Sequence, residues 1–381
     1  MTRTTETAVD SRRPVRTRRN LVVQAPGRVE LVEEELPDVP DGGLLLETVA
    51  TGLSAGTELT FVKGDHPGLH AELDPELGLF VPRPGQPAYP VTRLGYMEVA
   101  RVAESRTPAY RVGELVASPY GHATAHVSDP VREHVVPLPD DLDPVLGTYV
   151  AHLGPICANG LLHAASDVVP EVTSLGQGVA GRRVLVTGGG LIGLLTALFA
   201  AELGADEVAV VEADPRRAAV AEALGFWVLD ADDDAALAVK TRWRHGPGDH
   251  GADVAFQCRG RPFALATALR AVRPQGAVVD LAFYTDAADE VRLGEEFHHN
   301  GLRLLSAQIG RVPRGQSFGW DRRRLSAETL RLLQSRGDDV RRHLVTDVVD
   351  LADAPALLAD VAAHRRHVVS AVFTVDEPSD G

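Results

Sequence analysis

The stretch Arg183-Val-Leu-Val-Thr-Gly-Gly-Gly-Leu-Ile-Gly193 decides the fold of this chain. A short apolar run leads into a glycine-rich turn, and an apolar helical pattern continues from the turn to Gly204. A second apolar run, Glu207-Val-Ala-Val-Val-Glu212, follows and ends on a carboxylate. Strand, glycine turn, helix, strand and acidic residue in this order are typical of a βαβ unit that binds a dinucleotide.

The three spaced glycines of the turn each meet a different requirement. Gly188 allows a sharp turn out of the strand, Gly190 leaves out the β-carbon that would block a pyrophosphate, and Gly193 lets the helix lie close to the sheet. The helix that starts at Leu191 and Ile192 offers unpaired backbone N–H groups to the phosphates. The spacing therefore predicts a bound dinucleotide.

The residue that ends the second strand indicates which dinucleotide is bound. Glu212 lies nineteen residues after Gly193, where a carboxylate accepts both ribose hydroxyls of an adenosine and repels a 2′-phosphate. Arg216 and Arg217 point the other way, because a guanidinium can hold a 2′-phosphate. Glu212 comes first and occupies the end of the strand, so the sequence favours NAD over NADP.

The composition is that of a globular enzyme with two domains. The chain has 381 residues, of which 44% are hydrophobic, and a net charge of −15. This charge is spread along the chain without a basic face, which argues against a nucleic-acid partner. The one cationic run lies between positions 12 and 19, in a segment poor in apolar residues that we expect to be a flexible arm, 1–18.

Targeting signals and cysteine content favour a cytoplasmic enzyme without a membrane partner. Residues 1–20 contain no apolar central region, so no secretory signal peptide is expected. Residues 184–201 are uncharged over the nominal length of a membrane span, but four glycines assign them to the nucleotide fold. Cys157 and Cys258 are too few for a disulfide framework or a four-cysteine zinc lobe.

The first part of the chain has short β-strand patterns broken by glycine and proline, which are typical of a small barrel-like domain. Strands are predicted at 20–24, 29–32, 44–50, 97–103 and 115–117. The segment 63–93 is rich in proline and glycine and is expected to be a long surface loop, of the kind that covers binding sites. A helix near 149–165 leads into the next domain.

After Gly181 strands and helices alternate, which predicts an α/β fold with a six-stranded doubly wound parallel sheet of the Rossmann type. Its strands are expected at 183–187, 207–212, 227–229, 253–257, 277–283 and 302–308. From about 325 a polar helix, a strand at 345–349, a helix at 352–364 and a strand at 368–375 are expected to return to the first domain. The expected division is therefore 1–18, 19–165, 166–324 and 325–381.

This order of a β-rich domain, a Gly-Gly-Gly-Leu-Ile-Gly nucleotide fold and a returning tail resembles the medium-chain dehydrogenase/reductase superfamily, the alcohol and polyol dehydrogenases. The likeness covers about 21–375, and matching fragments in the expected order include Val49-Ala-Thr-Gly52, Arg111-Val-Gly-Glu-Leu-Val-Ala117 and Leu344-Val-Thr-Asp-Val-Val349. The resemblance implies a GroES-like catalytic domain, a small-molecule substrate, and a homodimer paired through the edge strand at 302–308.

The chain departs from this superfamily at the metal ligands. Ser54 and Tyr96 stand where zinc-dependent members have two of their ligands, and the apolar Leu153 lies near the helix that usually carries the third, so no catalytic zinc is expected. Ser54-Ala-Gly-Thr-Glu58, together with His298-His-Asn300 and Ser306-Ala-Gln-Ile309, is similar to a zinc-free branch. That branch includes bacteriochlorophyllide-type alcohol dehydrogenases and enzymes of secondary metabolism.

Without zinc, side chains have to move the hydroxyl proton as hydride leaves the carbinol carbon. The resemblance places Tyr96 where a zinc-binding histidine points into the cleft; a space-filling aromatic is the alternative. Ser54 and Thr57, on the adjoining turn, either relay the proton or cap the backbone. Glu58 either orients this relay or, as we expect, holds the turn by accepting backbone N–H groups.

Histidines are the alternative general bases, because imidazole titrates near neutral pH. His66, in a Gly-Asp-His-Pro loop, and His152, next to the lost ligand position, are the best placed; a structural role is the alternative for both. His298 and His299 either line the substrate cleft or cap the end of a helix.

Two further groups have less specific patterns. His122 and His126 are four residues apart, but they fall in a loop and a strand pattern, which argues against a metal pair. A second cationic cluster near the last strand either receives an anionic substrate or forms a solvated loop with local salt bridges. It consists of Arg311, Arg314, Arg322, Arg323 and Arg324.

By resemblance, the ends of the later strands border the cofactor, with ordinary sheet core as the alternative for the small and aliphatic residues. The residues concerned are Cys258, Arg259, Ala282, Phe283, Ala307 and Ile309. Arg217 matches the basic residue that flanks the adenosine ribose in the superfamily.

The sequence thus predicts a zinc-independent, NAD(H)-linked dehydrogenase that interconverts a secondary alcohol and a ketone on a cyclic or sugar-like intermediate of a biosynthetic pathway. Three alternatives stay open: a reductase of conjugated C=C or imine bonds with Tyr96 as proton donor, a redox-neutral epimerase with tightly bound NAD, and a non-catalytic nucleotide-binding protein.

Overall fold

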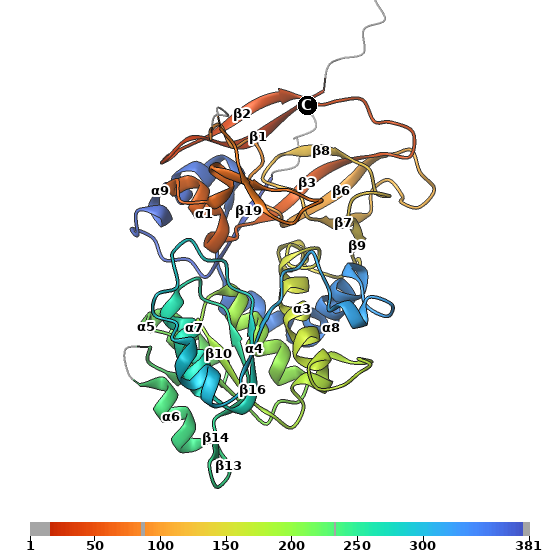
Figure 1. Cartoon of the computed structure of the whole chain (residues 1–381). Coiled ribbons are helices and arrows are strands. Elements are labelled where there is room, and N and C mark those ends of the chain that lie inside the picture. The colour runs from red at the N-terminus through yellow and green to blue at the C-terminus, as the bar shows by residue number, and fades with distance from the viewer. Residues whose placement is uncertain (1–15, 85–87, 232–233, 376–381) are drawn as a thin grey trace, which may run out of the picture.

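The computed structural model describes residues 16–84, 88–231 and 234–375, which form two lobes (Figure 1). The upper lobe in this view contains a seven-stranded sheet with the order β18-β19-β3-β6-β7-β9, in which β8 also pairs with β3. The bounds of these strands are β3 (Leu44–Gly52), β6 (Glu98–Ser105), β7 (Leu115–Ser118), β8 (Ala125–Ser128), β9 (Val136–Pro137), β18 (Val345–Asp350) and β19 (Ser370–Thr374).

A separate antiparallel pair, β1 (Thr17–Ala25) and β2 (Arg28–Glu35), lies at the outer end of this lobe (Figure 1). Leu21 and Val23 of β1 are fully buried and pack in one core with residues of the C-terminal part of the chain. β1 includes the last two residues of the predicted flexible arm, and residues 1–15 of that arm lie outside the described residues.

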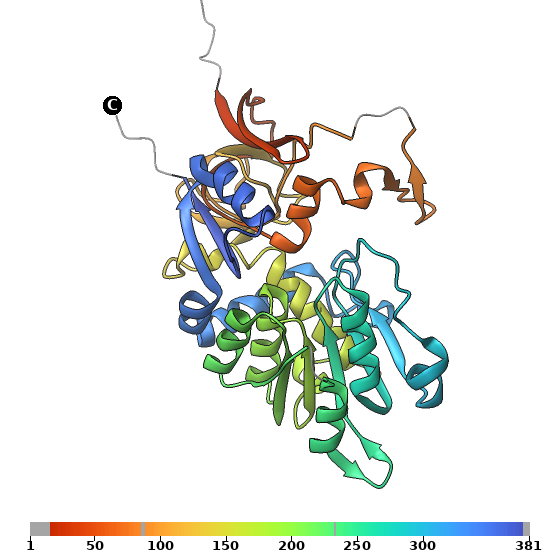
Figure 2. The same ribbon diagram turned by 90° about the vertical axis from the view of Figure 1, so that its left-hand side faces the viewer.

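The segment 63–93 was expected to be one long loop, but it contains a short hairpin. β4 (Ala71–Leu73) pairs antiparallel with β5 (Phe80–Pro82). The Asp74 side chain accepts the backbone N–H groups of Glu76 and Leu77 at 2.9 and 2.8 Å and so closes the turn between the two strands. In Figure 2 the hairpin projects from the upper lobe on the side of the strand-end loops of the lower lobe.

The C-terminal part of the chain returns to the first lobe. β19 pairs antiparallel with β3 and parallel with β18, so the end of the chain completes the sheet that the beginning starts. Helix α9 (Ala354–Ala362) lies beside α1 (Ala55–Lys63) in both views, and its Leu357 and Leu358 are buried with Leu53 and Val62.

The lower lobe contains six parallel strands in the order β12-β11-β10-β15-β16-β17. Numbered along the chain this order is 3-2-1-4-5-6, that of a doubly wound dinucleotide-binding sheet, with its switch point between β10 and β15. The prediction of a six-stranded parallel sheet is confirmed. The strands are β10 (Arg183–Thr187), β11 (Glu207–Val211), β12 (Trp227–Leu229), β15 (Ala252–Gln257), β16 (Val272–Asp280) and β17 (Arg303–Ser306).

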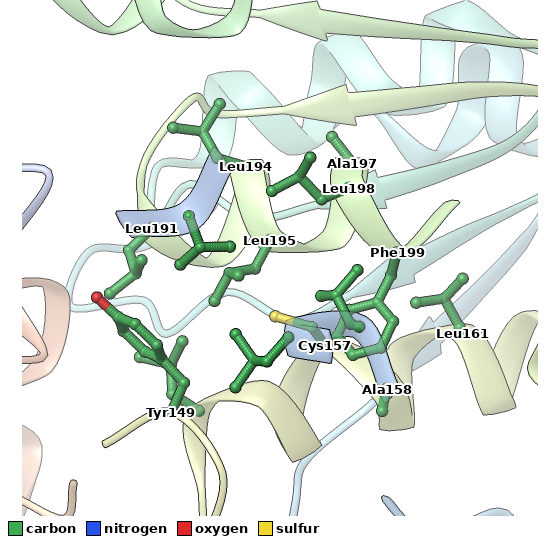
Figure 3. Close-up of a cluster of buried hydrophobic side chains, with 14 of the residues drawn as sticks. Tyr149, Cys157, Ala158, Leu161, Leu191, Leu194, Leu195, Ala197, Leu198 and Phe199 are labelled. Carbon is green, nitrogen blue, oxygen red and sulfur yellow. The ribbon is translucent and has the colours of Figure 1, made fainter. Parts of the chain in front are cut away.

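Helices cover both faces of this sheet, as the continuous apolar strands require. Val184 and Val186 belong to a core on one face, while Leu185 belongs to a core on the other. On the first face α3 (Leu153–Ser166) packs on α4 (Leu191–Glu202) and α8 (Arg322–Asp339). Figure 3 shows Cys157 of α3 facing side chains of α4. The other face carries α6 (Ala235–Arg242) and α7 (Pro262–Ala271).

Several predicted boundaries differ from the structure. The helix expected at 149–165 begins at Leu153, because the short α2 (Pro144–Gly147) and a turn precede it. The strand expected at 277–283 begins earlier and ends at Asp280, whose carboxylate accepts the N–H of Ala282 at 3.0 Å and turns the chain. None of the described helices is long and apolar enough to cross a membrane. The expected limits 19–165, 166–324 and 325–381 stay predictions.

Candidate active site

The glycine turn after β10 has the geometry that close helix packing requires. Gly188 has a φ of +102°, a region that favours glycine, and its N–H donates to the carbonyl of Val211 at 2.8 Å. A β-carbon on Gly193 would lie 1.8 Å from the carbonyl oxygen of Gly188. A β-carbon on Gly190 would meet only the Arg217 guanidinium, at 3.9 Å. The space in front of Gly190 is therefore open, as a phosphate approaching the turn would need.

Glu212 is buried at the end of β11 and holds the turn together. Its Oε2 accepts the N–H of Gly189 at 2.7 Å, and its Oε1 accepts those of Ala213 and Asp214 at 2.9 and 2.8 Å. The Arg259 guanidinium lies 3.8 Å from Oε1. The carboxylate is thus fixed beside the turn, at the position from which it was expected to accept ribose hydroxyls.

Two basic side chains beside the turn, Arg217 and His367, keep nitrogen atoms without a partner among the described residues. Arg217 donates from Nη2 to the carbonyl of Val368 at 3.4 Å, but its buried Nε has no hydrogen bond. His367, on the returning tail, approaches Asp214 at 3.5 Å through Nδ1, and its buried Nε2 has no hydrogen bond. Buried donors are normally paired, so these atoms are suited to a polar ligand. Open space and unpaired donors together fit the diphosphate and adenosine ribose of a dinucleotide.

The other predicted cofactor residues lie at the carboxyl ends of the parallel strands, the edge where ligands bind in such sheets. Leu191 and Ile192 form the first turn of α4, and the remaining ones follow β15, β16 and β17: Cys258, Arg259, Ala282, Phe283, Ala307 and Ile309. Asn159 of α3 fixes the last of these loops by donating to the carbonyls of Gln308 and Arg311 at 3.2 and 3.1 Å. Ala307 is 1% exposed and also belongs to the core.

Three hydroxyl groups meet at the start of α1, in the upper lobe. The phenol of Tyr96 donates to Ser54 Oγ, and Ser54 makes no side-chain cap to the helix. Burial and the negative charge of Glu58 raise the pKa of Tyr96, while hydrogen bonds from Ser54 and Thr57 act in the opposite direction. The phenol is therefore protonated at neutral pH and is a proton donor.

A buried chain of polar groups supports this cluster from behind. Glu58 accepts the backbone N–H of Ser54 through Oε1 at 2.7 Å, as the sequence led us to expect, and contacts His122 Nε2 through Oε2 at 2.7 Å. The Nδ1 of His122 is hydrogen-bonded to Thr51. Because Glu58 and His122 are at most 1% exposed, this chain fixes the turn that carries Ser54.

His152 lies beside Tyr96, with the two rings 4.4 Å apart. Its Nδ1 accepts a hydrogen bond from Arg322, so the proton of the neutral ring is on Nε2. Burial, then the charge of Arg322 and the nearby His134, lower the pKa of His152 to about 3. The ring can donate a hydrogen bond from Nε2, but it has no free acceptor nitrogen, which argues against the role of general base.

His66 contacts residues of both lobes and is not part of the hydroxyl cluster around Tyr96. Its ring stacks between Phe61 and Phe283, with centroid distances of 3.7 and 5.1 Å. Its Nδ1 accepts the N–H of Gly68 at 2.9 Å, and burial lowers its pKa. The contact with Phe283 places His66 against the strand-end loop that follows β16.

The residues at the zinc position do not fit a metal. Ser54 and Tyr96 offer neutral hydroxyls bonded to each other, and Leu153 is 1% exposed and apolar. His122 and His126 contact different carboxylates, since His126 lies 3.3 Å from Glu98. Within the described ranges no group of three or more His, Cys, Asp or Glu side chains is arranged to hold a metal ion.

The remaining sequence candidates are mostly peripheral. His298 and His299 are exposed and precede β17, at the amino end of the sheet and not at its carboxyl edge, which favours the alternative in which they end a helix over the one in which they line the cleft. Of the second cationic cluster, Arg324 stacks on Trp320 at 3.7 Å, whereas Arg322 reaches His152. Among the described side chains of that cluster, Arg322 is the one that is hydrogen-bonded to a candidate catalytic residue.

Sequence reasoning missed several residues of the site. Gln257 is fully buried at the switch point, accepts from Thr187 Oγ1 at 2.6 Å and donates to the Arg259 carbonyl at 2.6 Å. A polar residue ending an apolar strand was the signal that could have identified it. His134 also lies near His152, but no local pattern distinguishes it.

Comparisons with known proteins concern the family and the fold of this chain. A family model described as zinc-binding dehydrogenase matches residues 192–317. D-guloside 3-dehydrogenase of Shigella flexneri is 26% identical over 353 residues, which cover 88% of this chain and 94% of that protein. The chain belongs to the medium-chain dehydrogenase/reductase superfamily. It is an oxidoreductase of the alcohol dehydrogenase type.

Two further superfamily members are similar over different extents. L-idonate 5-dehydrogenase of Vitis vinifera is 35% identical over 103 residues, 25% of this chain and 26% of that protein. The crystal structure of galactitol-1-phosphate dehydrogenase from Escherichia coli superposes with a TM-score of 0.71 at 16% identity, covering 93% of this chain and 99% of that one. At this identity the second likeness concerns the fold, with its Rossmann and GroES-like parts.

Proposed function

We propose that this chain is a zinc-independent, NAD(H)-linked dehydrogenase that interconverts a secondary alcohol and a ketone on a sugar-like or cyclic substrate. The observation that carries the proposal is the hydroxyl cluster of Tyr96, Ser54 and Thr57; by resemblance, Ser54 and Tyr96 stand at positions of the superfamily's zinc ligands. Similar proteins named for D-guloside and L-idonate support a polyol-type substrate. A cytoplasmic homodimer paired through β17, which lies at the edge of the parallel sheet, is part of the proposal.

The nicotinamide dinucleotide, when bound, supplies the acceptor and donor of the hydride. The residues that would hold it are those of the glycine turn, with Glu212 and Arg217 at the adenosine ribose and the unpaired Nε2 of His367 nearby. Glu212 favours NAD, because a second negative charge beside this carboxylate would be repelled. The preference over NADP rests on that carboxylate.

Tyr96 moves the proton at the substrate oxygen. In ketone reduction the carbonyl oxygen of the substrate gains negative charge and takes the proton of Tyr96, whose O–H bond breaks. The phenol is then reprotonated through the neighbouring hydroxyl, Ser54 Oγ. A raised pKa keeps the phenol protonated, which favours this direction at neutral pH. The Nε2–H of His152 is the second donor beside that oxygen, since Arg322 occupies its other nitrogen.

The test is turnover with a panel of polyols, cyclitols and sugar acids, followed at the absorbance of the reduced nicotinamide with NAD and with NADP. Tyr96→Phe should lower kcat by about 10²- to 10⁴-fold while leaving the Kd for NADH unchanged. Tyr89→Phe is the matched control, because that phenol donates to the carbonyl of Phe61 at 2.6 Å and not into the cluster. Unchanged turnover in Tyr96→Phe would remove Tyr96 from the mechanism.

A further inference from the structure

A polar cavity of about 170 Å³ lies where the start of α8 meets the upper lobe, and its residue Arg322 also contacts His152. Its volume is more than ten times the space, about 15 Å³, that one water requires. The residues that line it come from four separate parts of the chain, and those used below are Arg93, Tyr120, Arg132, Glu133, His134 and Arg322. We call it the arginine cavity.

The arginine cavity has an excess of positive charge. Arg93, Arg132 and Arg322 line it, and Glu133 is the one acidic residue among the lining side chains. Burial, together with the charges of Arg322 and Arg323, lowers the pKa of His134 to about 4, so His134 adds no charge at neutral pH. The chain as a whole has a net charge of −15, so the excess of arginine in this cavity is not explained by a generally basic surface.

Two of these guanidinium groups lack a carboxylate partner among the residues that the structure describes. Arg93 lies over the ring of Tyr120, 5.0 Å from its centroid. Arg322 donates to the carbonyl of Ala151 at 3.3 and 3.2 Å and to His152. Most arginines of the chain are paired, for example Arg273 with Asp253 at 2.6 Å. Guanidinium groups in a cavity without a counter-ion are suited to an anionic ligand.

The single acid of the cavity is engaged elsewhere. Glu133 accepts a hydrogen bond from Ser128 Oγ at 2.6 Å. Arg132 approaches Asp129 at 3.5 Å, but its side chain is 87% exposed and can turn toward a ligand. The groups that remain for a ligand are therefore mainly hydrogen-bond donors.

A hydrogen bond and a ring contact connect one residue of the arginine cavity to Tyr96. Arg322 forms its wall and donates to His152, whose ring lies 4.4 Å from that of Tyr96. Arg93 and Tyr96 are also separated by only two residues along the chain. A substrate whose carbinol meets Tyr96 and whose far end reaches the wall formed by Arg322 would bring that end to these arginines.

We propose that the arginine cavity binds an anionic group, a carboxylate or a phosphate, at the end of the substrate away from the carbinol that Tyr96 serves. The substrate is then a sugar acid or a sugar phosphate and not a neutral polyol. This inference rests on the proposed function for the reacting end of the substrate, but anion binding itself is independent of turnover.

The experiment is calorimetric titration of the full chain, saturated with NADH so that the dinucleotide site is filled. The probes are inorganic phosphate, D-gluconate and, as a neutral analogue, D-glucitol. We expect saturable binding of at least one anion, weakened by salt, and none of D-glucitol. If only phosphate binds, the anionic group is a phosphate; if only gluconate binds, it is a carboxylate. Either result supports the proposal.

The double substitution Arg93→Gln and Arg132→Gln should raise the Kd of the bound anion about tenfold or more. Arg93→Lys keeps the charge and should retain most of the affinity, which separates anion binding from a folding defect. Arg244→Gln is the control, because Arg244 is exposed on β13 (Arg244–Gly246) at the far end of the lower lobe (Figure 1). With an anionic substrate, the double variant should raise KM and leave kcat unchanged.

Absence of saturable binding for both anions, or equal affinity in the double variant, overturns the proposal. Oxidation of neutral polyols with NAD in that case leaves the proposed function standing. If anion binding depends on Arg93 and Arg132 but no alcohol is oxidised, the anion site is supported and the proposed function is wrong.

Discussion

Gly190 and Gly193 lie in the same turn but have different surroundings, so substitutions at the two positions should separate fold stability from cofactor binding. In Gly193→Ala the new β-carbon would lie 1.8 Å from the Gly188 carbonyl oxygen, against an ordinary contact that begins near 3.4 Å. Helix α4 then has to move away from β10, and overpacking of this kind costs about 3 kcal/mol. The better helix propensity of alanine returns about 1 kcal/mol, which leaves a net loss of about 2 kcal/mol in unfolding free energy.

Gly190→Ala should behave in the opposite way. Its β-carbon meets only the Arg217 guanidinium at 3.9 Å, and its φ of −81° suits any residue, so the loss of stability should stay below about 1 kcal/mol. The same β-carbon would fill the space in front of the turn, so the Kd for NADH should rise about tenfold or more, equivalent to about 1.4 kcal/mol.

Urea unfolding and calorimetric titration of NADH on both variants are the assays. The reasoning is refuted if Gly190→Ala binds NADH as tightly as the parent chain, because the diphosphate then does not lie against Gly190. It is also refuted if Gly193→Ala is as stable as the parent chain.

Three further predictions concern charge and protonation. Because burial and Glu58 raise the pKa of Tyr96 above 10, the rate of ketone reduction should stay level through neutral pH and fall only above 10; initial rates that already fall near pH 7 would contradict this assignment. Glu212→Ala frees three backbone N–H groups, so titrations should show a Kd for NADH raised about tenfold and a smaller preference over NADPH; an unchanged ratio of the two affinities would rule out Glu212 as the selecting group. The pKa of His134 is about 4 in the folded chain, against about 6.5 when the chain is unfolded. The stability that is present above pH 6.5 is therefore lost as the pH falls toward 4, by at most about 1.4 kcal/mol per pH unit before solvent screening. Urea unfolding of His134→Gln should show a shallower loss over this range, and an identical slope would show that other groups cause it.

The nucleotide-binding half could be predicted from the sequence because its signals are local. A parallel strand buried on both faces reads as a continuous apolar run, and Val184, Leu185 and Val186 indeed alternate between two cores. The glycine spacing is likewise a property of a few consecutive residues. The predicted strand starting at Ala277 began too late because the polar residues of β16, around Arg273 and Gln275, resemble a loop.

The catalytic half was predicted less completely because its decisive contacts join distant residues. The state of His152 depends on Arg322, which is 170 residues away in the sequence. In the sequence Arg322 is one of three consecutive arginines. It is the first residue of α8, and the position of that helix in the fold brings it to His152. The charge of the arginine cavity is likewise a property of the assembled fold and not of any segment.

The central claim is that hydride transfer to and from a nicotinamide dinucleotide proceeds here with a phenol in place of zinc. The most direct measurement is NAD-linked turnover of an accepted alcohol before and after exhaustive dialysis against a strong zinc chelator, with metal content determined on the same samples. The account predicts unchanged kcat in protein free of zinc, and no gain when Zn²⁺ is added back. Loss of activity on chelation, with recovery on addition of Zn²⁺, would contradict it.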